Sequence, residues 1–291
     1  VLLQSGCLCC TIRGELSAAM RELHSKRERG LVPPFRRLVI ESTGLAEPFP
    51  ILSTVKADPV LRHHFKLGKV ITTVDAVNGL GQLASHEESL RQAAIADHLV
   101  VTKTDLADAA TTEALLVRLE AINPAATVCR AAEVEIDADG LLGLEPFEPQ
   151  ARHSLELIGA DDEQTTGNEH DQEPAHSHHG AGIEAFTVVF EQPLDWTAFG
   201  IWLAMLLNRH GDRVLRVKGI LNLAGEPNPV AVHGVQHLVH SPVHMRAWPD
   251  DDRRSRIVFI VDRLDPALIR RSLAVFNQIG GASQAENGYA A

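Results

Sequence analysis

Three of the four cysteines lie close together, at Cys7, Cys9 and Cys10. Thiolates bind soft and borderline metal ions such as Zn²⁺ and Cu(I), so this cluster predicts a metal site. A disulfide framework would spread the cysteines along the chain, and adjacent Cys9 and Cys10 pair poorly with each other. In an extended segment Cys7 and Cys9 face one side, and Cys10 points away unless the backbone turns. A complete tetrahedral site needs a fourth ligand or solvent, and such an open site suits metal transfer. Inert buried thiols are the alternative interpretation.

An acidic residue and a glycine follow an apolar run in the segment Glu41-Ser42-Thr43-Gly44. In nucleotide hydrolases an acid at this point orients Mg²⁺ or the attacking water, and the glycine N–H reaches the γ-phosphate. Glu41 and Gly44 are therefore candidate catalytic residues. The alternative is a helix start, with Ser42 or Thr43 as the N-cap and Glu47 in the first turn.

Thr102, Lys103 and Asp105 form the pattern Thr-Lys-x-Asp directly after another apolar run. A guanine-specificity loop has this form because a carboxylate can accept hydrogen bonds from both the ring N–H and the exocyclic amine of guanine. Asp105 would accept these bonds, and the aliphatic stem of Lys103 would cover the base plane. The three residues are candidate ligands of a guanine nucleotide. A surface Lys-x-Asp without a ligand is the alternative.

Two groups of histidines could also bind metal. The first lies in an acidic stretch at 161–180 that has six acidic residues, no Lys or Arg and no large apolar side chain. Imidazoles on such a flexible tether can collect Zn²⁺, Ni²⁺ or Co²⁺ loosely, and a plain solvated linker is the equal alternative. The second group falls in a strand-like segment, where its spacing does not align the side chains, so we favour no metal role there. The groups are His170, His176, His178 and His179, and His233, His237, His240 and His244.

These residues need a framework, and the first half of the chain alternates short β-branched runs with helical patterns, as in a parallel α/β sheet. The first three runs each end in polar residues, and ligands bind beyond the carboxyl ends of the strands in such sheets. We therefore expect a site at this edge of the sheet. The expected strands are 37–40, 70–74, 98–101 and 126–129, and the expected helices are 15–28, 87–96 and 112–122.

The second half has the order β-α-β-β-β-α, which predicts a small α+β domain with an antiparallel sheet. Asp265 and Pro266 suit the N-cap and the first position of its last helix. The expected strands are 184–190, 214–223, 230–239 and 256–261, and the expected helices are 196–208 and 265–277. The expected division is an α/β domain over 1–150, an acidic His-containing linker over 151–182, the α+β domain over 183–279 and a disordered tail over 280–291.

Composition excludes several classes of function. The 291 residues, 45% of them hydrophobic, suffice for two domains. The net charge of −11 argues against a nucleic-acid partner, because binding along a phosphate backbone requires a basic surface. No apolar run approaches the roughly 20 residues that span a bilayer, and no secretory leader opens the chain. We therefore expect a cytoplasmic protein with no membrane contact.

Three motifs in this order and spacing resemble those of the CobW family of GTPases. They are GCLCC from Gly6, ESTGLAEP from Glu41 and TKTD from Thr102. The segments 215–221 and 234–236 are similar to the carboxyl-terminal domain of that family, and the His-bearing linker falls where family members often carry one. The family is related to the nickel-insertion GTPases of urease and hydrogenase maturation.

The resemblance implies a parallel-sheet P-loop GTPase-like domain followed by a CobW-type α+β domain. It also implies a GTP-driven metal chaperone that uses Mg²⁺, that is most often linked to zinc and in other branches to cobalt, and that delivers metal to a metalloprotein client. Nucleotide state would control metal capture or release. The implied site residues are Cys7, Cys9 and Cys10 for the metal, Glu41 and Gly44 for phosphate and Mg²⁺, and Thr102, Lys103 and Asp105 for the base.

The chain departs from the family in one large respect. Family members begin with a strand and a phosphate loop, G-x-x-G-x-G-K-[ST], whose backbone N–H groups and lysine hold the β- and γ-phosphates. This sequence has no Gly-Lys followed by Ser or Thr, since Gly68 and Lys69 are followed by Val70. We expect a chain without that loop to be an incompetent GTPase.

Two hypotheses explain the missing loop. In the first, the chain is an amino-terminally truncated piece of a complete metallochaperone GTPase, which the start at Val1 favours. In the second, it is a nucleotide-independent metal-binding or interaction protein that keeps the GTPase fold. The upstream reading frame separates them, because an in-frame phosphate loop supports the first and a stop codon immediately before Val1 excludes it.

Overall fold

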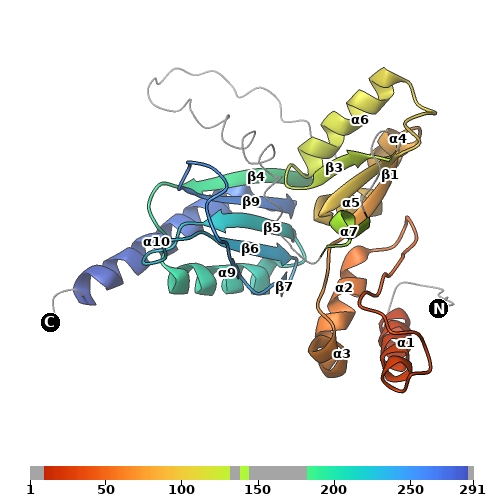
Figure 1. The fold of residues 1–291 in the computed structure, drawn as a ribbon. Coiled ribbons are helices and arrows are strands. Elements are labelled where there is room, and N and C mark those ends of the chain that lie inside the picture. Colours follow the sequence, from red (N-terminus) through yellow and green to blue (C-terminus); the bar gives the residue numbers. More distant parts are fainter. Residues whose placement is uncertain (1–9, 132–137, 144–181, 288–291) are drawn as a thin grey trace.

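The computed structural model describes residues 10–131, 138–143 and 182–287 and has two β-sheets, one from each half of the chain (Figure 1). The first sheet is parallel and has the order β1-β2-β3. Its strands pair so that Ile71 lies opposite His98 and His98 lies opposite Thr127. Three of the four strands expected in this half are therefore confirmed. They are β1 (Ile71–Asp75), β2 (His98–Thr102) and β3 (Thr127–Arg130).

The fourth expected strand, at 37–40, is wrong. The segment forms no strand, and its Val39 and Ile40 side chains are 67% and 38% exposed. A strand requires a neighbour that supplies hydrogen bonds, and within the described ranges none lies beside this segment. Its β-branched composition therefore did not suffice to place it in the sheet.

Helices α3 (Pro59–His64) and α6 (Ala109–Ile122) each begin after an aspartate that caps the helix. Asp58 caps α3 by accepting hydrogen bonds from the N–H groups of Val60 and Leu61, at 2.9 and 3.1 Å. Asp108 caps α6 through the N–H of Thr111, at 2.8 Å, so this helix starts earlier than expected. The helices are α1 (Cys10–Glu28), α2 (Pro48–Ala57), α3 (Pro59–His64), α4 (Gly79–Ser85), α5 (Glu87–Ile95), α6 (Ala109–Ile122) and α7 (Ala138–Leu141).

Helices α1, α2 and α3 share a small apolar core of their own. Leu16 and Met20 of α1 pack with Val55 of α2 and Leu61 of α3. Figure 1 shows this group as a separate cluster below the parallel sheet. Leu52 of α2 is partly buried against the core of the parallel sheet, so α2 connects this group to the rest of the domain.

Asn123 holds the carboxyl end of α5. Its side chain is 1% exposed, and its amide nitrogen lies 2.9, 3.0 and 2.9 Å from the carbonyl oxygens of Ala93, Ala94 and Ala96. The Ala93 carbonyl also accepts from the Ala96 N–H at 3.3 Å. Ala94 and Ala96 lie at the end of the helix, where carbonyls lack an intrahelical donor, so the amide supplies the hydrogen bond that these two need.

We expect Asn123→Ala to lower the free energy of unfolding by about 1–3 kcal/mol, because it removes the side-chain donor from the Ala94 and Ala96 carbonyls. Urea denaturation followed by circular dichroism measures this change. The matched control is Asn208→Ala on the exposed face of α9 (Trp196–His210), which we expect to stay within about 0.5 kcal/mol of the parent. Equal effects of the two substitutions would contradict the capping role.

The second sheet is antiparallel and has the order β4-β9-β5-β6-β7, with β8 beside β6. It confirms the expected α+β domain. Its strands are β4 (Ile183–Phe190), β5 (Val214–Leu221), β6 (Val230–Val235), β7 (Leu238–Val239), β8 (Val243–His244) and β9 (Ser255–Asp262), and its helices are α9 (Trp196–His210) and α10 (Pro266–Asn287).

Two expected elements of this domain have different bounds. The segment 230–239 is a hairpin of β6 and β7 and not one strand, because Gln236 turns the chain with a φ of 49°. The last helix continues through Gly280 to Asn287, past its expected end at 277. Two glycines weaken a helix by about 1 kcal/mol each but do not break it. None of the described helices has the length and apolar character needed to cross a bilayer.

Both faces of the second sheet are buried. Along β9, Ile257, Phe259 and Val261 pack in the cluster that contains residues of α9 and α10. The alternating Val258 and Ile260 belong to the core of the first domain, which also takes in Leu215 and Val235. The two domains therefore share one continuous apolar core.

Candidate functional site

The carboxyl ends of β1 and β2 meet at one edge of the parallel sheet. Asp75 ends β1 and lies opposite Thr102, which ends β2. The Thr102 hydroxyl donates to the Val74 carbonyl at 3.3 Å, and the Ala76 N–H donates to the Thr102 carbonyl at 2.9 Å. Thr102 thus ties the two strand ends together, at the edge where open α/β sheets bind ligands.

Lys103 is fixed by Asp75. Its ammonium lies 2.5 Å from a carboxylate oxygen of Asp75, and its backbone has a φ of 58°, a conformation that few non-glycine residues adopt. Lys103 and the N–H groups of Val77 and Asn78 outweigh burial and lower the pKa of Asp75 to about 2. Asp75 is a site residue that sequence reasoning missed. Its place at the end of β1, one strand away from Thr102, could have indicated it.

Asp105 follows on the same turn. The Leu106 N–H donates to the Lys103 carbonyl at 3.0 Å, which closes the turn and leaves the Asp105 side chain exposed. In the part of the chain that the structure describes, no side chain or backbone group bonds to its carboxylate. Both oxygens can therefore accept hydrogen bonds from a ligand that presents two adjacent N–H groups.

The loop that contains Glu41 and Gly44 is held by α5. Both residues are exposed, and a Cβ added to Gly44 would meet nothing within 4 Å. The amide nitrogen of Gln92 donates to the carbonyls of Thr43, Gly44 and Ala46, at 3.4, 3.1 and 2.8 Å. The loop therefore presents Glu41 and an open glycine to solvent while its carbonyls face the helix.

The alternative interpretation of this segment, a helix capped by Ser42 or Thr43, is wrong. Helix α2 starts at Pro48, and Glu47 occupies the N-cap position without a side-chain cap bond. The Glu47 carboxylate accepts a hydrogen bond from Arg91 of α5 at 2.8 Å instead. Arg91 and Gln92 are also residues that sequence reasoning missed, because nothing in the sequence around α5 indicates contacts with a loop so distant in the chain.

The candidate metal ligands lie mostly outside the described residues. Cys7 and Cys9 fall outside them, as do the linker histidines, and Cys10 is known only as the first residue of α1. Among the described residues, no three His, Cys, Asp or Glu side chains are grouped so as to hold a metal ion. The metal site thus stays a prediction from the sequence.

Two histidines of the second group lie near the domain boundary. His233 on β6 is 7% exposed, and burial together with Arg216 and Lys218 lowers its pKa to about 3. Burial, and then the charge of Lys56, also lowers the pKa of His240. Both imidazoles are therefore neutral at physiological pH.

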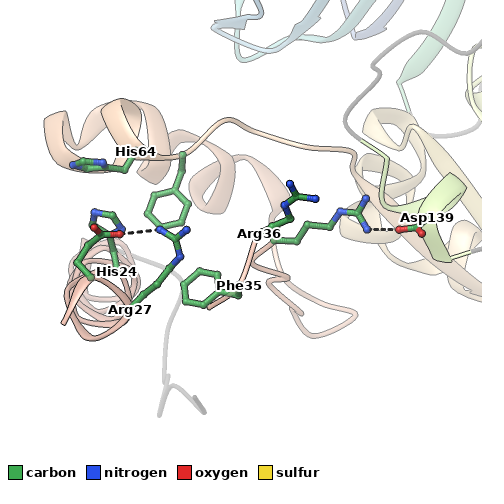
Figure 2. Close-up of a pocket in the computed structure, with 9 residues that line it drawn as sticks. His24, Arg27, Phe35, Arg36, His64 and Asp139 are labelled. Atoms are coloured by element: carbon green, nitrogen blue, oxygen red, sulfur yellow. Dashed lines mark hydrogen bonds and ion pairs between the residues drawn. The ribbon is translucent and has the colours of Figure 1, made fainter. Parts of the chain in front are cut away.

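A separate cavity of about 960 Å³ lies between α1, α3 and the segment 35–37 (Figure 2). The rings of His24 and His64, with centroids 4.1 Å apart and planes tilted by 34°, lie at one end of it, and Asp139 lies at the other end. Asp139 pairs with Arg37 at 2.7 Å. The cavity is lined by none of the residues predicted for the metal or the nucleotide, so it is distinct from the sheet-edge site.

Comparisons with known proteins cover both domains. The family model described as "CobW/HypB/UreG, nucleotide-binding domain" matches residues 1–130. A second family model, "Cobalamin synthesis protein cobW C-terminal domain", matches residues 183–277. The zinc chaperone YjiA of Escherichia coli is 32% identical over 277 residues, which cover 94% of this chain and 80% of the relative. The zinc-regulated GTPase metalloprotein activator 1 of Schizosaccharomyces pombe is 25% identical over 242 residues, which cover 76% and 57%.

A solved structure agrees with these matches. The crystal structure of Zn(II)-bound YjiA GTPase from Escherichia coli is similar to this one with a TM-score of 0.68 and 31% sequence identity, over 89% of this chain and 76% of that chain. The family models, the sequence relatives and the solved structure all indicate the same family for this chain. The chain belongs to the CobW/HypB/UreG family of nucleotide-binding proteins and carries the cobW carboxyl-terminal domain.

Proposed function

We propose that the complete protein is a GTP-dependent metal chaperone. It would bind zinc through Cys7, Cys9 and Cys10 and deliver it to a metalloprotein client as GTP is hydrolysed. The observation that carries the nucleotide part is the turn at the sheet edge, where Asp75 fixes Lys103 and Asp105 presents an open carboxylate. The names of the relatives, a zinc chaperone and a zinc-regulated GTPase metalloprotein activator, support zinc as the metal and a metalloprotein as the client.

The residues of the sheet edge fit the base of a guanine nucleotide. Asp105 would accept its ring N–H and exocyclic amine, and the stem of Lys103 would lie along the base plane. On the loop, Glu41 would orient Mg²⁺ or the attacking water, and the N–H of Gly44 would donate to the γ-phosphate. The phosphate loop is the part of the nucleotide site that these residues do not supply.

The test compares zinc transfer with and without nucleotide. The product of the whole reading frame is loaded with one equivalent of Zn²⁺, and release to a chromogenic chelator is followed with Mg²⁺ and GTP, with Mg²⁺ and ATP, or with Mg²⁺ alone. We expect GTP to change the release rate and ATP to have no effect. Equal rates in all three mixtures would contradict GTP control.

We expect Asp105→Asn to weaken GTP binding by about 10- to 100-fold, because the amide places a donor against the amine of guanine. Xanthosine triphosphate, which has a carbonyl in place of that amine, should bind the variant better than GTP does. Competition against a fluorescent GTP analogue measures both affinities. Asp108→Asn is the matched control, because Asp108 caps α6 and should affect stability but not base preference. If Asp105→Asn kept the parent's preference for GTP over xanthosine triphosphate, Asp105 would not belong to the base site.

The second candidate is a nucleotide-independent metal-binding or interaction protein. The observation that favours it is the absence of a Gly-Lys-Ser or Gly-Lys-Thr sequence from these 291 residues. It predicts tight zinc binding with no measurable affinity for GTP in the same competition experiment.

A further inference from the structure

Helix α5 lies between the loop of residues 41–47 and the carboxyl-terminal domain, and it contacts both. Gln92 donates to three carbonyls of the loop, as described above. The Thr72 hydroxyl of β1 donates to the Gln92 carbonyl at 2.9 Å, which anchors this part of the helix to the parallel sheet. Gln92 therefore connects the loop to a part of α5 that is bonded to the parallel sheet.

Arg91 connects the two sides directly. One nitrogen of its guanidinium lies 2.8 Å from Glu47 at the end of the loop, and the other lies 3.2 Å from Asp262 at the end of β9. The Arg91 and Asp262 side chains are 29% and 11% exposed, so water screens this pair only in part. Burial works against the charge of Arg91, but Glu47 and Asp262 outweigh it and raise its pKa.

A third carboxylate also contacts Arg91. Glu87, one turn earlier on α5, has an oxygen 3.6 Å from the same nitrogen that contacts Asp262. The other Glu87 oxygen accepts from Arg263, the residue after Asp262, at 2.8 Å. Arg91 therefore contacts three carboxylates at once, so a change at one of them alters its attraction to the other two.

Asp262 stands at a junction of the carboxyl-terminal domain. Its backbone N–H donates to the Arg213 carbonyl at 2.7 Å, and the next residue, Arg263, donates from its N–H to the Gly182 carbonyl at 2.6 Å. Arg263 and Gly182 have φ angles of 52° and 54°, so the backbone on both sides of this bond is confined to an uncommon conformation. A displacement of Asp262 would therefore reach both the start of β5 and the residue before β4.

We propose that Arg91 couples the loop of residues 41–47 to the carboxyl-terminal domain, so that a ligand at the loop and the end of β9 influence each other. The coupling is reciprocal, because each side acts on the other through the same guanidinium. The identity of the ligand, the phosphates of GTP, rests on the proposed function. The coupling itself does not, since both ends of the contact exist without nucleotide.

The first experiment needs no ligand. Hydrogen exchange of the peptide 41–47 is measured in Asp262→Asn, in Arg91→Gln and in the double variant, and the Ala46 N–H, which donates to the Thr43 carbonyl at 3.0 Å, is the reporter. We expect each single variant to speed its exchange about two- to fivefold, and the double variant to match Arg91→Gln alone. Lys218→Met breaks a different interdomain contact, 2.9 Å from the Ala125 carbonyl, and should leave the loop unchanged.

Three outcomes would overturn the coupling. Asp262→Asn could leave loop exchange unchanged while Arg91→Gln raises it, which would make Arg91 a support of the loop alone. The effects of the two variants could be additive, which would make them independent. Lys218→Met could match Asp262→Asn, which would make the effect general loosening of the interface. Exchange within β5 identifies any variant that has lost its fold.

The second experiment adds Mg²⁺ and GTP to the product of the whole reading frame. We expect protection both at residues 102–106 and at the end of β9, and we expect Arg91→Gln to keep the first and lose the second. Protection at 102–106 without any change at β9 in the parent protein would overturn the coupling. No protection at 102–106 would contradict the proposed function, and the ligand-free experiment would then decide the coupling by itself.

Discussion

Replacing Arg216 with methionine is expected to lower the free energy of unfolding by about 3–5 kcal/mol. The substitution leaves the Asp97 carboxylate, at the interface between the two domains, without its counter-charge. Arg216 lies on β5 of the carboxyl-terminal domain and is 3% exposed. It donates to the Asp97 carboxylate and to the carbonyl of Ile95, the last residue of α5. Methionine keeps most of the apolar stem, so the loss reports on the charge and its hydrogen bonds.

The cost depends on Asp97 as much as on Arg216. Burial opposes ionisation of this carboxyl, but Arg216, Lys218 and the Val70 N–H, which donates at 2.8 Å, outweigh it and lower its pKa to about 2. Without Arg216 the carboxylate keeps one backbone donor but loses its main counter-charge. The helix end also loses a cation at its negative pole.

Urea denaturation at neutral pH measures the loss. The matched control is Arg37→Met, because Arg37 also pairs with an aspartate, Asp139, but the two side chains are 40% and 84% exposed. An exposed pair of this kind contributes about 0–1 kcal/mol, so the control should stay near the parent. Similar losses in the two variants would contradict the special role of the buried pair.

Acid should reduce the difference in the free energy of unfolding between Arg216→Met and the parent. The Asp97 carboxyl has a lower pKa in the folded protein than the roughly 3.9 of an unfolded chain, so the stability it contributes is full above that value. That contribution is lost as the pH falls through about 2, where the carboxyl becomes protonated in the folded state. A deficit that stays constant from pH 7 to about 2 would contradict this assignment.

Replacing Cys7, Cys9 and Cys10 by serine is expected to remove one tightly bound equivalent of zinc. Serine has no thiolate to offer, and losing even a hydrogen-bond partner of a metal ligand costs about 10- to 100-fold in affinity. Losing three ligands should therefore weaken binding by more than about 100-fold. Titration against a fluorescent zinc indicator in the presence of GTP measures both stoichiometry and affinity.

Two controls test whether the effect belongs to this cluster. Cys129→Ser removes the remaining cysteine, which lies half-buried on β3, and burial raises the pKa of its thiol, so it is a poor ligand at neutral pH. We expect this variant to keep the tight equivalent. Alanine at all four linker histidines should remove only loosely held zinc. An unchanged stoichiometry in the cysteine variant would show that the tight site lies elsewhere.

The parts of the fold that could be predicted are those with a local signal. β9 has a continuous apolar run because it is buried on both faces, and Asp265 and Pro266 correctly indicate the start of α10. The segment 37–40 has the same composition, but no neighbouring strand is present in the described residues. The composition of a segment indicates whether its side chains can be buried. Whether it forms a strand depends on a neighbouring strand that supplies backbone hydrogen bonds.

The candidate site divides in the same way. Lys103 and Asp105 were identified because guanine recognition requires neighbouring residues on a single turn. Asp75, Arg91 and Asp262 act through contacts with residues far away in the sequence, and each of them looks like an ordinary surface charge when the chain is read residue by residue. Long-range ion pairs leave no periodicity, so only the folded arrangement identifies them.

The shared core of the two domains has a consequence for proteolysis. Val258 and Ile260 of β9 pack in the core of the first domain together with Leu215 and Val235. A protease that cuts between Gly143 and Gly182 would break the peptide connection, but separating the fragments would expose this apolar surface to water. The two fragments of a nicked chain would therefore migrate together until a denaturant is added.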